Sequence, residues 1–246
     1  MNPQAWQWVL LGLGAFLVGL SKTGIAGIGV LSVALFAHAL PARESTGALL
    51  PLLLVADVFG VAFFRKHAVW SHLWRLFPWV VAGILGGYLA LGRVSNEQVA
   101  RMIGCIIVAM VALQVWRERQ KDLLAARLPH AGWFVASVGM LAGFTTMAAN
   151  AAGPVMGLYL LAIGLPKLEF VGTGAWFFLL VNALKLPFSA HLGLINAESI
   201  RMDAVLLAPM VPGALLGPLL LRHINQRLFE VMVLALALVV AVRLLI

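Results

Sequence analysis

The sequence predicts an all-α integral membrane protein with about eight transmembrane segments, arranged as two repeats of four segments each. Of its 246 residues, 63% are hydrophobic and 11% are charged, whereas soluble proteins contain about 45–50% apolar and about 25% charged residues. A spanning helix needs roughly 20 apolar residues, and the chain contains enough of them for about eight such helices. Soluble enzyme domains, disordered tails and disulfide scaffolds are therefore excluded, the last because Cys105 is the one cysteine.

The apolar runs give the order of the segments. They cover 5–20, 28–40, 46–64, 73–92 and 98–116 in the first half, and 132–148, 153–165, 170–189, 203–221 and 227–246 in the second. In each half the first two runs are short and are separated by a glycine-rich break, at Ser21–Gly29 and at Thr145–Pro154. We interpret each pair as one membrane segment made of two half-helices or a re-entrant loop. The first repeat is then 1–120, a basic connector is 121–131, and the second repeat is 132–246.

Residues that correspond between the halves indicate this internal repeat. Gly19 and Gly29 match Gly143 and Gly153 at a separation of 124, Asp57 matches Asn182 at 125, and Gly83 and Gly87 match Gly213 and Gly217 at 130. A shared Leu-Pro step, at Leu40 and Leu165, adds to the correspondence. For Gly83, Gly87 and their partners in the second half we expect close helix packing rather than a functional role.

The net charge of +8 is explained by membrane topology. Most basic residues lie in short loops, where the positive-inside rule places them on the cytoplasmic side, so we expect no nucleic-acid partner. We expect a multi-pass protein of a bacterial-type inner membrane. The more basic side of the membrane includes both termini, so we expect both to lie on the cytoplasmic side. The stretch from Met1 to Gln4 has no basic residue, so we expect no cleaved signal peptide.

The two breaks are the predicted substrate site, because broken helices at matching positions of two repeats are typical of transporters. A half-helix that begins after a break directs its free N–H groups and positive dipole end at the site, which favours an anion. The glycines let a ligand approach the backbone, and polar side chains accompany them. The candidate residues are Ser21, Lys22, Thr23, Gly24, Gly27 and Gly29 in the first break, and Thr145, Thr146, Asn150 and Gly153 in the second.

Three ionisable residues fall within the predicted membrane segments, where such residues are costly and are functional candidates. They are Lys22, Asp57 and Lys185, and Lys185 shares a helix face with Asn182 three residues earlier. An anion could be held between the two lysines and the half-helix N-termini. Asp57 is the candidate coupling group: it pairs with a lysine at rest or carries a coupling proton. In the structural alternative, Lys185 extends to the interface and Asp57 only joins helices.

No cofactor and no metal are expected. The six histidines lie near segment ends or in loops, and no His-x-x-x-His spacing suggests zinc. No serine occupies a Gly-x-Ser-x-Gly elbow, so the sequence gives little support to a membrane hydrolase.

The same residues resemble a known family, the TauE/SafE sulfite exporters. Gly19–Gly29 and Leu49–Asp57 resemble its first half, and Gly143–Thr146, Ala152–Pro154, Leu165–Lys167 and Phe170–Pro187 resemble its second. The resemblance covers essentially the whole chain, and it implies a two-repeat membrane protein that moves sulfite or organosulfonates such as sulfoacetate, usually outward. Relatives often have a histidine in the second break where this chain has Asn150, so a proton-coupling role of that histidine does not transfer.

We therefore expect a secondary transporter of small sulfur-containing anions that works by alternating access and is not an enzyme. Its partners would be the anion, the lipid bilayer, coupling protons and, in an oligomer, further copies of the chain. An anion channel of the same architecture is the alternative. A membrane enzyme or biogenesis factor would need a catalytic group, and a metal-cation transporter would need clustered carboxylates; the sequence offers neither.

Overall fold

A computed structural model describes residues 4–24, 28–40, 42–90, 108, 111, 112 and 131–245. Over these residues the chain is helical and contains no strand, which confirms the all-α prediction. The helices are α1 (Ala5–Thr23), α2 (Gly29–Ala39), α3 (Ala42–Phe64), the 3-10 turn η1 (Arg65–His67), α4 (Trp70–Ala90), α7 (Gly132–Ala149), α8 (Ala152–Ala162), α9 (Lys167–His191), α10 (Ala197–His223) and α11 (Gln226–Leu245). Most of the predicted run 98–116 and of the connector 121–131 lies outside the described residues.

Four described helices are long and apolar enough to cross a bilayer. They are Ala5–Thr23, Ser45–His67, Lys167–His191 and Ala197–His223. At a rise of about 1.5 Å per residue, a helix of this length spans the roughly 30 Å hydrocarbon core. The chain is thus built to cross the membrane more than once, and the count of eight segments stays a prediction.

The described chain forms two compact units, and each is described here by itself. Unit 1 comprises Met1–Ala68 and Val171–Asn225, and unit 2 comprises Val69–Phe170 and Gln226–Ile246. Each unit therefore takes residues from both predicted repeats. The repeats were defined by matching residues in the sequence, whereas the two units are defined by contacts in space. The repeat boundaries therefore stay a prediction.

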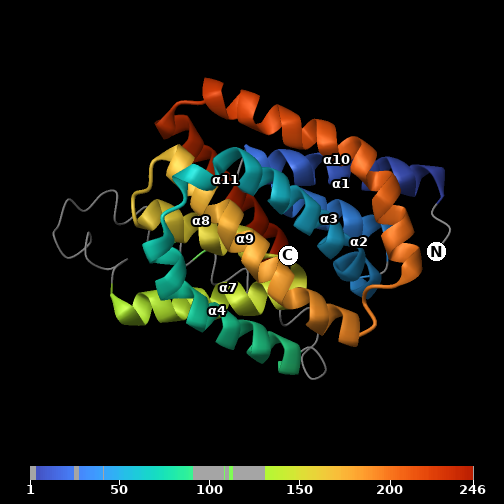
Figure 1. The fold of residues 1–246 in the computed structure, drawn as a ribbon, viewed down its shortest axis with the longest axis horizontal. Helices are drawn as coiled ribbons and strands as arrows, with labels where there is room; N and C mark the ends of the chain where they lie inside the picture. The colour runs from blue at the N-terminus through green and yellow to red at the C-terminus, as the bar shows by residue number, and fades with distance from the viewer. Residues whose placement is uncertain are drawn as a thin grey trace. The chain divides into compact units, whose positions relative to one another are not determined.

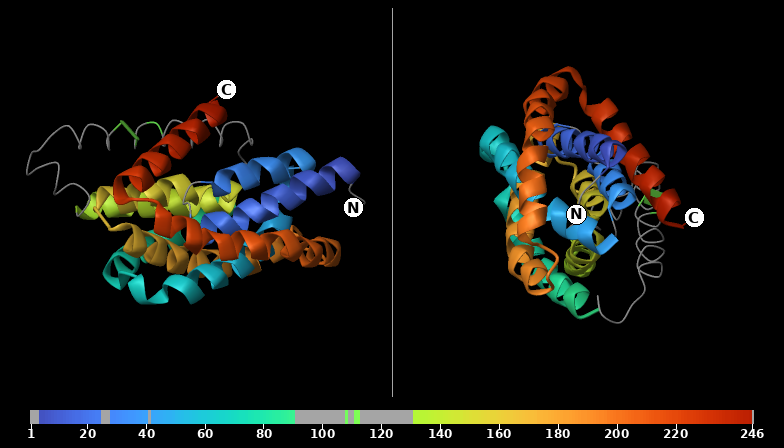
Figure 2. Two further views of the ribbon diagram at one scale, coloured as in Figure 1. Left: turned by 90° about the horizontal axis from the view of Figure 1, so that it is seen from above. Right: turned by 90° about the vertical axis from the view of Figure 1, so that its right-hand side faces the viewer.

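In unit 1, α1 and α2, the helices on either side of the first break, lie side by side (Figure 2). The Gln7 side-chain amide donates to the Ala39 carbonyl at 2.7 Å, and the Gly29 N–H donates to the Ser21 hydroxyl at 3.0 Å. These bonds join the beginning of α1 to the end of α2, and the end of α1 to the beginning of α2. The two helices are therefore antiparallel, which is the geometry of a re-entrant segment rather than of two half-helices in line.

Close glycine packing joins α1 to α10 in unit 1 (Figure 1). A Cβ atom added to Gly19 would collide with the carbonyl oxygen of Met210, and one added to Gly213 would collide with that of Phe16. Since each obstacle is backbone, the helices could accept larger residues only by moving apart. The buried side chains of this unit, among them Leu11 and Leu52, form one apolar core around the contact.

Unit 2 contains the same kind of contact between α4 and α7 (Figure 1). A Cβ atom on Gly143 would collide with the Val80 carbonyl oxygen, and one on Gly83 with that of Met140. Gly87 likewise faces α7, at Phe144 and Met147, and in unit 1 Gly217 faces the end of α1 at Thr23. The predicted packing role of these glycines is confirmed.

The partners in the two glycine contacts correspond under the predicted repeat. Phe16 and Met140 are separated by 124 residues, as are Gly19 and Gly143. Val80 and Met210 are separated by 130 residues, as are Gly83 and Gly213. Thus the first helix of one half packs against the fourth α-helix of the other half in both units, through equivalent atoms. This agreement supports the internal repeat.

Candidate functional site

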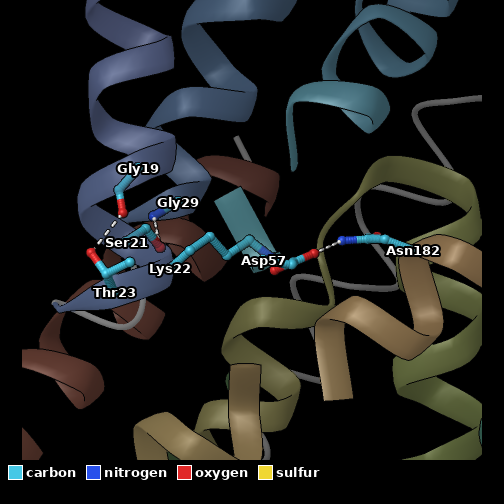
Figure 3. A network of polar contacts seen from close by, with 7 residues as sticks. All are labelled: Gly19, Ser21, Lys22, Thr23, Gly29, Asp57 and Asn182. Carbon is cyan, nitrogen blue, oxygen red and sulfur yellow. Dashed lines mark hydrogen bonds and ion pairs between the residues drawn. The ribbon is translucent and has the colours of Figure 1, made fainter. Parts of the chain in front are cut away.

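A buried polar chain crosses unit 1 from α1 through α3 to α9 (Figure 3). The Lys22 ammonium lies 2.8 Å from Asp57 Oδ1, and the Asn182 side-chain amide donates to Asp57 Oδ2 at 2.6 Å. The carboxylate thus receives an ammonium on one oxygen and an amide on the other. The structure brings together three residues that the sequence selected separately, one from the first break and two from the matching long helices.

These groups are held away from solvent. Asp57 is fully buried, Asn182 is 2% exposed, and the Lys22 side chain is 10% exposed. The Lys22 ammonium also lies over the Phe178 ring, 3.9 Å from its centre, where the ring's electron-rich face attracts a cation. In a low-dielectric interior such a pair is strong, but the desolvation of both ions offsets much of the gain. The pair therefore contributes less to stability than its short distance alone suggests.

Asp57 and Asn182 occupy matching positions of the two halves and contact each other directly. They are separated by 125 residues, the repeat offset between α3 and α9. Equivalent residues touch when they lie at the point where two related elements cross. The carboxylate in one half and the amide in the other make this crossing chemically asymmetric, with one acceptor and one donor.

Lys185 adds a second cation to the same region. Its side chain is 1% exposed, and its charge acts on both Lys22 and Asp57. It lies one helical turn beyond Asn182 on α9, as expected from the three-residue spacing. In the described part of the chain no three His, Cys, Asp or Glu side chains gather as metal ligands. Two lysines and one carboxylate suit an anion better than a metal cation.

Glycine at position 60 lets the first break approach α3. A Cβ atom there would lie 2.7 Å from the backbone carbonyl oxygen of Lys22 and 3.3 Å from the Ala175 side chain. Lys22 itself is in the last turn of α1, where the negative end of the helix dipole favours a cation. The sequence analysis did not select Gly60, and its position one turn after Asp57 was the available signal.

The other residues of the first break serve the backbone. The Thr23 hydroxyl is fully buried and lies within donor distance of the Gly19 and Ala214 carbonyls, at 3.0 and 2.8 Å. The Ser21 hydroxyl accepts the Gly29 N–H, one of the donors at the start of α2. Gly24 ends α1 and faces the backbone of α10 at Gly217. Gly27 lies outside the described residues. The Ser21 hydroxyl thus satisfies a donor at the start of α2, and the Thr23 hydroxyl joins the end of α1 to the interior of α10.

The second break belongs to unit 2. Helix α7 ends at Asn150, whose backbone is left-handed at φ 51°, and α8 begins two residues later. The buried Thr145 hydroxyl donates to the Ala142 carbonyl at 3.2 Å, and Thr146 is also buried. Among the described residues, a Cβ atom on Gly153 would meet nothing within 4 Å, so these residues leave space beside the first turn of α8. That this break completes the site of the first break stays a prediction.

One buried carboxylate was missed by the sequence analysis. Asp203, on α10 in unit 1, is 6% exposed, and neither carboxylate oxygen has a hydrogen-bond partner in the structure as described. It is the first residue of the apolar run 203–221, so its position at the edge of that run concealed it. Asp203 is an ionisable residue at the edge of a predicted membrane segment, and it belongs with Lys22, Asp57 and Lys185 as a functional candidate.

Comparison with known proteins gives one match. The family model described as Sulfite exporter TauE/SafE matches residues 11–244, nearly the whole chain. No curated protein and no solved structure matches significantly. The match includes both breaks and the site residues Lys22, Asp57 and Asn182. The chain therefore belongs to the TauE/SafE sulfite exporter family.

Proposed function

We propose that this protein is a secondary transporter that exports small sulfur-containing anions, such as sulfite or organosulfonates including sulfoacetate. Family membership implies a membrane transporter of sulfur anions. The observation that carries the proposal is the Lys22–Asp57 pair, a buried ammonium at the turn of an interrupted helix segment. An ionisable pair in this position is costly to keep within a membrane unless it works on a substrate.

Binding proceeds by exchange of partners at Lys22. An incoming oxyanion takes the ammonium from Asp57, and Asn182 retains the carboxylate through its amide donor, 2.6 Å from Oδ2. Lys185 adds attraction from α9. Asp57, freed from its cation in a low-dielectric interior, then favours a proton, which couples the anion to proton movement.

The transport cycle uses the two predicted repeats. Equivalent glycine contacts in units 1 and 2 support the repeats, each with an interrupted first segment. Alternating access is then the exchange of conformations between the halves, with substrate at the breaks. Thr145, Thr146, Asn150 and Gly153 are the second half of the site in this proposal. In this proposal both termini lie on the cytoplasmic side of the inner membrane. Homo-oligomers are compatible with the helix faces that carry small residues.

Uptake into proteoliposomes tests the proposal with labelled sulfite and sulfoacetate. Lys22→Ala removes the ammonium, and we expect the initial flux to fall at least about tenfold. Truncating one partner of a buried, hydrogen-bonded charge pair typically costs about 2–5 kcal/mol of binding free energy. The protein stays folded, because Asp57 keeps its bond to Asn182 and can take up a proton. Lys66→Ala, at an exposed lysine of η1, is the matched control. Near-normal flux in Lys22→Ala would rule out this site.

The same assay separates a carrier from an anion channel. A carrier saturates and responds to a proton gradient, whereas a channel passes anions at far higher rates without one. The buried carboxylate beside the lysine favours the carrier. A non-saturating flux that is insensitive to the proton gradient would favour the channel.

A further inference from the structure

We propose that Ser32, on α2 of unit 1, is a substrate-binding residue whose hydroxyl donates a hydrogen bond to an oxygen of the transported anion. The proposal rests on the proposed function and adds to its site a residue that the sequence analysis did not select. It comes from a buried hydroxyl without a described partner, in the first turns of the helix that follows the first break.

The Ser32 hydroxyl is fully buried, and in the part of the chain that the structure describes it has no hydrogen-bond partner. A serine or threonine hydroxyl within a helix often donates to the carbonyl three or four residues earlier. The buried Thr145 hydroxyl donates in this way to the Ala142 carbonyl at 3.2 Å. Ser32 makes no such bond. A buried donor without an acceptor is costly, and a ligand that supplies the acceptor removes this cost.

The side chain of Ser32 is directed toward the first break. Ser32 lies three residues after Gly29 and four residues before Phe36, so the three share one face of α2. Both neighbours face α1: the Gly29 N–H donates to the Ser21 hydroxyl, and a Cβ atom on Gly14 would lie 2.9 Å from the Phe36 ring. Ser32 therefore lies between α1 and α2. Because side chains in a helix incline toward its N-terminus, the Ser32 hydroxyl is inclined toward the break.

The N-terminus of α2 is suited to an anion. It is the positive end of a helix dipole, its N-cap Ile28 supplies no side-chain acceptor, and its first turn contains no acidic residue. The acceptor at Gly29 is the neutral Ser21 hydroxyl (Figure 3). Lys22 follows Ser21 directly, so the ammonium of the proposed site belongs to the residue beside this terminus. A hydroxyl donor, a helix N-terminus and an ammonium together suit the oxygens of sulfite or a sulfonate.

A packing role alone would explain the small size of Ser32 but not its hydroxyl. Ser32→Ala separates the two roles, because alanine keeps the small side chain and removes the donor. Since the hydroxyl is buried without a described partner, its removal should leave the unfolding midpoint in detergent unchanged or raise it. The same substitution should weaken substrate binding if the hydroxyl bonds the anion.

Initial rates of labelled sulfite uptake into proteoliposomes, measured over a range of sulfite concentrations, test the proposal. We expect Ser32→Ala to raise the KM for sulfite about tenfold, because one hydrogen bond to a charged ligand is lost. In detergent, the rise of the unfolding midpoint that a fixed sulfite concentration produces should be smaller in Ser32→Ala than in the wild type.

Ser199→Ala is the matched control, at another buried serine of unit 1. The Ser199 hydroxyl donates to the Asn196 carbonyl at 2.9 Å and accepts the Asn196 N–H at 3.1 Å, at the start of α10. Because these bonds cap a helix, Ser199→Ala should lower the unfolding midpoint without sulfite and keep the wild-type KM. The two serine variants should therefore differ in opposite ways in stability and in substrate binding.

The outcomes separate the inference from the function on which it rests. If folded Ser32→Ala keeps the wild-type KM while Lys22→Ala loses flux, the inference is wrong and the proposed function stands. If Ser32→Ala does not fold, Ser32→Cys decides, because a thiol is of similar size but a weaker donor. A KM above that of the wild type then supports the inference, and an equal KM overturns it. If the wild type takes up neither sulfite nor sulfoacetate, the proposed function fails and the inference fails with it.

Discussion

Two buried carboxylates of unit 1 show that the effect of a buried carboxylate on stability depends on its hydrogen-bond and ion-pair partners. Asp57 has an ammonium at 2.8 Å and an amide donor at 2.6 Å. Asp203 has no hydrogen-bond partner among the described residues, although both its oxygens are buried. A buried acceptor without a donor costs about 1–3 kcal/mol, whereas removing one partner of a buried ion pair costs about 3–5 kcal/mol. The same substitution should therefore have opposite effects at the two positions.

We expect Asp203→Leu to raise the thermal unfolding midpoint in detergent and Asp57→Leu to lower it. The first variant removes an unpaired polar group from an apolar setting. The second removes the carboxylate that pairs with the Lys22 ammonium. Flux of labelled sulfite should persist in Asp203→Leu and disappear in Asp57→Leu. Loss of flux in a folded Asp203→Leu variant would contradict this prediction and assign Asp203 to the transport cycle.

At this scale the charged residues that the sequence selected lie close together in unit 1, while their role in binding stays a prediction. Lys22, Asp57 and Lys185 stood out because charge within a membrane segment needs a reason. Ser21 and Thr23 were selected as ligands, but their hydroxyls bond backbone groups at Gly29 and Ala214. Helix termini present unpaired backbone groups wherever a break occurs, so neighbouring hydroxyls have a local use that composition cannot distinguish from ligand binding.

Among the elements, the α4–α7 contact in unit 2 shows where a glycine is required. Gly83 and Gly86 lie three residues apart in α4. A Cβ atom on Gly83 would collide with the Met140 carbonyl oxygen, while one on Gly86 would meet nothing within 4 Å in the part of the chain that the structure describes. The apolar runs in the sequence predict helix lengths and breaks. They do not predict which face of α4 contacts α7, because that depends on tertiary packing.

We expect Gly83→Ala to destabilise the protein by about 1–3 kcal/mol, because the backbone of α7 must move away. Gly86→Ala should be neutral or stabilising by up to about 1 kcal/mol, since alanine is the better helix former. Thermal unfolding of the two variants in the same detergent measures the difference. An equal loss of stability in both would show that intrinsic flexibility, not the contact with Met140, explains these glycines.

At the scale of the whole molecule, sequence correspondence and spatial grouping are different properties. The offsets of 124 and 130 relate the α1–α10 contact of unit 1 to the α4–α7 contact of unit 2. These contacts agree with the helix equivalences that the sequence predicts, and the repeat itself stays a prediction. The sequence did not predict that each compact unit combines helices from both halves, because periodicity describes one helix at a time and contains no information about its partner.

The repeat is not followed everywhere, and the departure at the breaks is open to experiment. Ser21 and Thr145 correspond at 124, yet Ser21 accepts the Gly29 N–H while Thr145 donates to Ala142 within its own helix. A Cβ atom on Gly29 would lie 2.8 Å from the Ser21 hydroxyl oxygen, whereas one on Gly153 would meet no described residue within 4 Å. The first break is therefore closed by its own side chain, and the second has room beside its backbone.

We expect Gly29→Ala to lower the unfolding midpoint, because its methyl group would push the Ser21 hydroxyl away and weaken a hydrogen bond worth about 1 kcal/mol. Gly153→Ala should leave stability nearly unchanged but reduce flux, because the methyl group fills space at the predicted second half of the site. The double variant Ser21→Ala/Gly29→Ala is the control. In the Ser21→Ala background, Gly29→Ala should lower the unfolding midpoint less than it does in the wild type. If Gly153→Ala transports normally, the open space beside α8 does not receive substrate; if both glycine variants lose equal stability, the two breaks are equivalent after all.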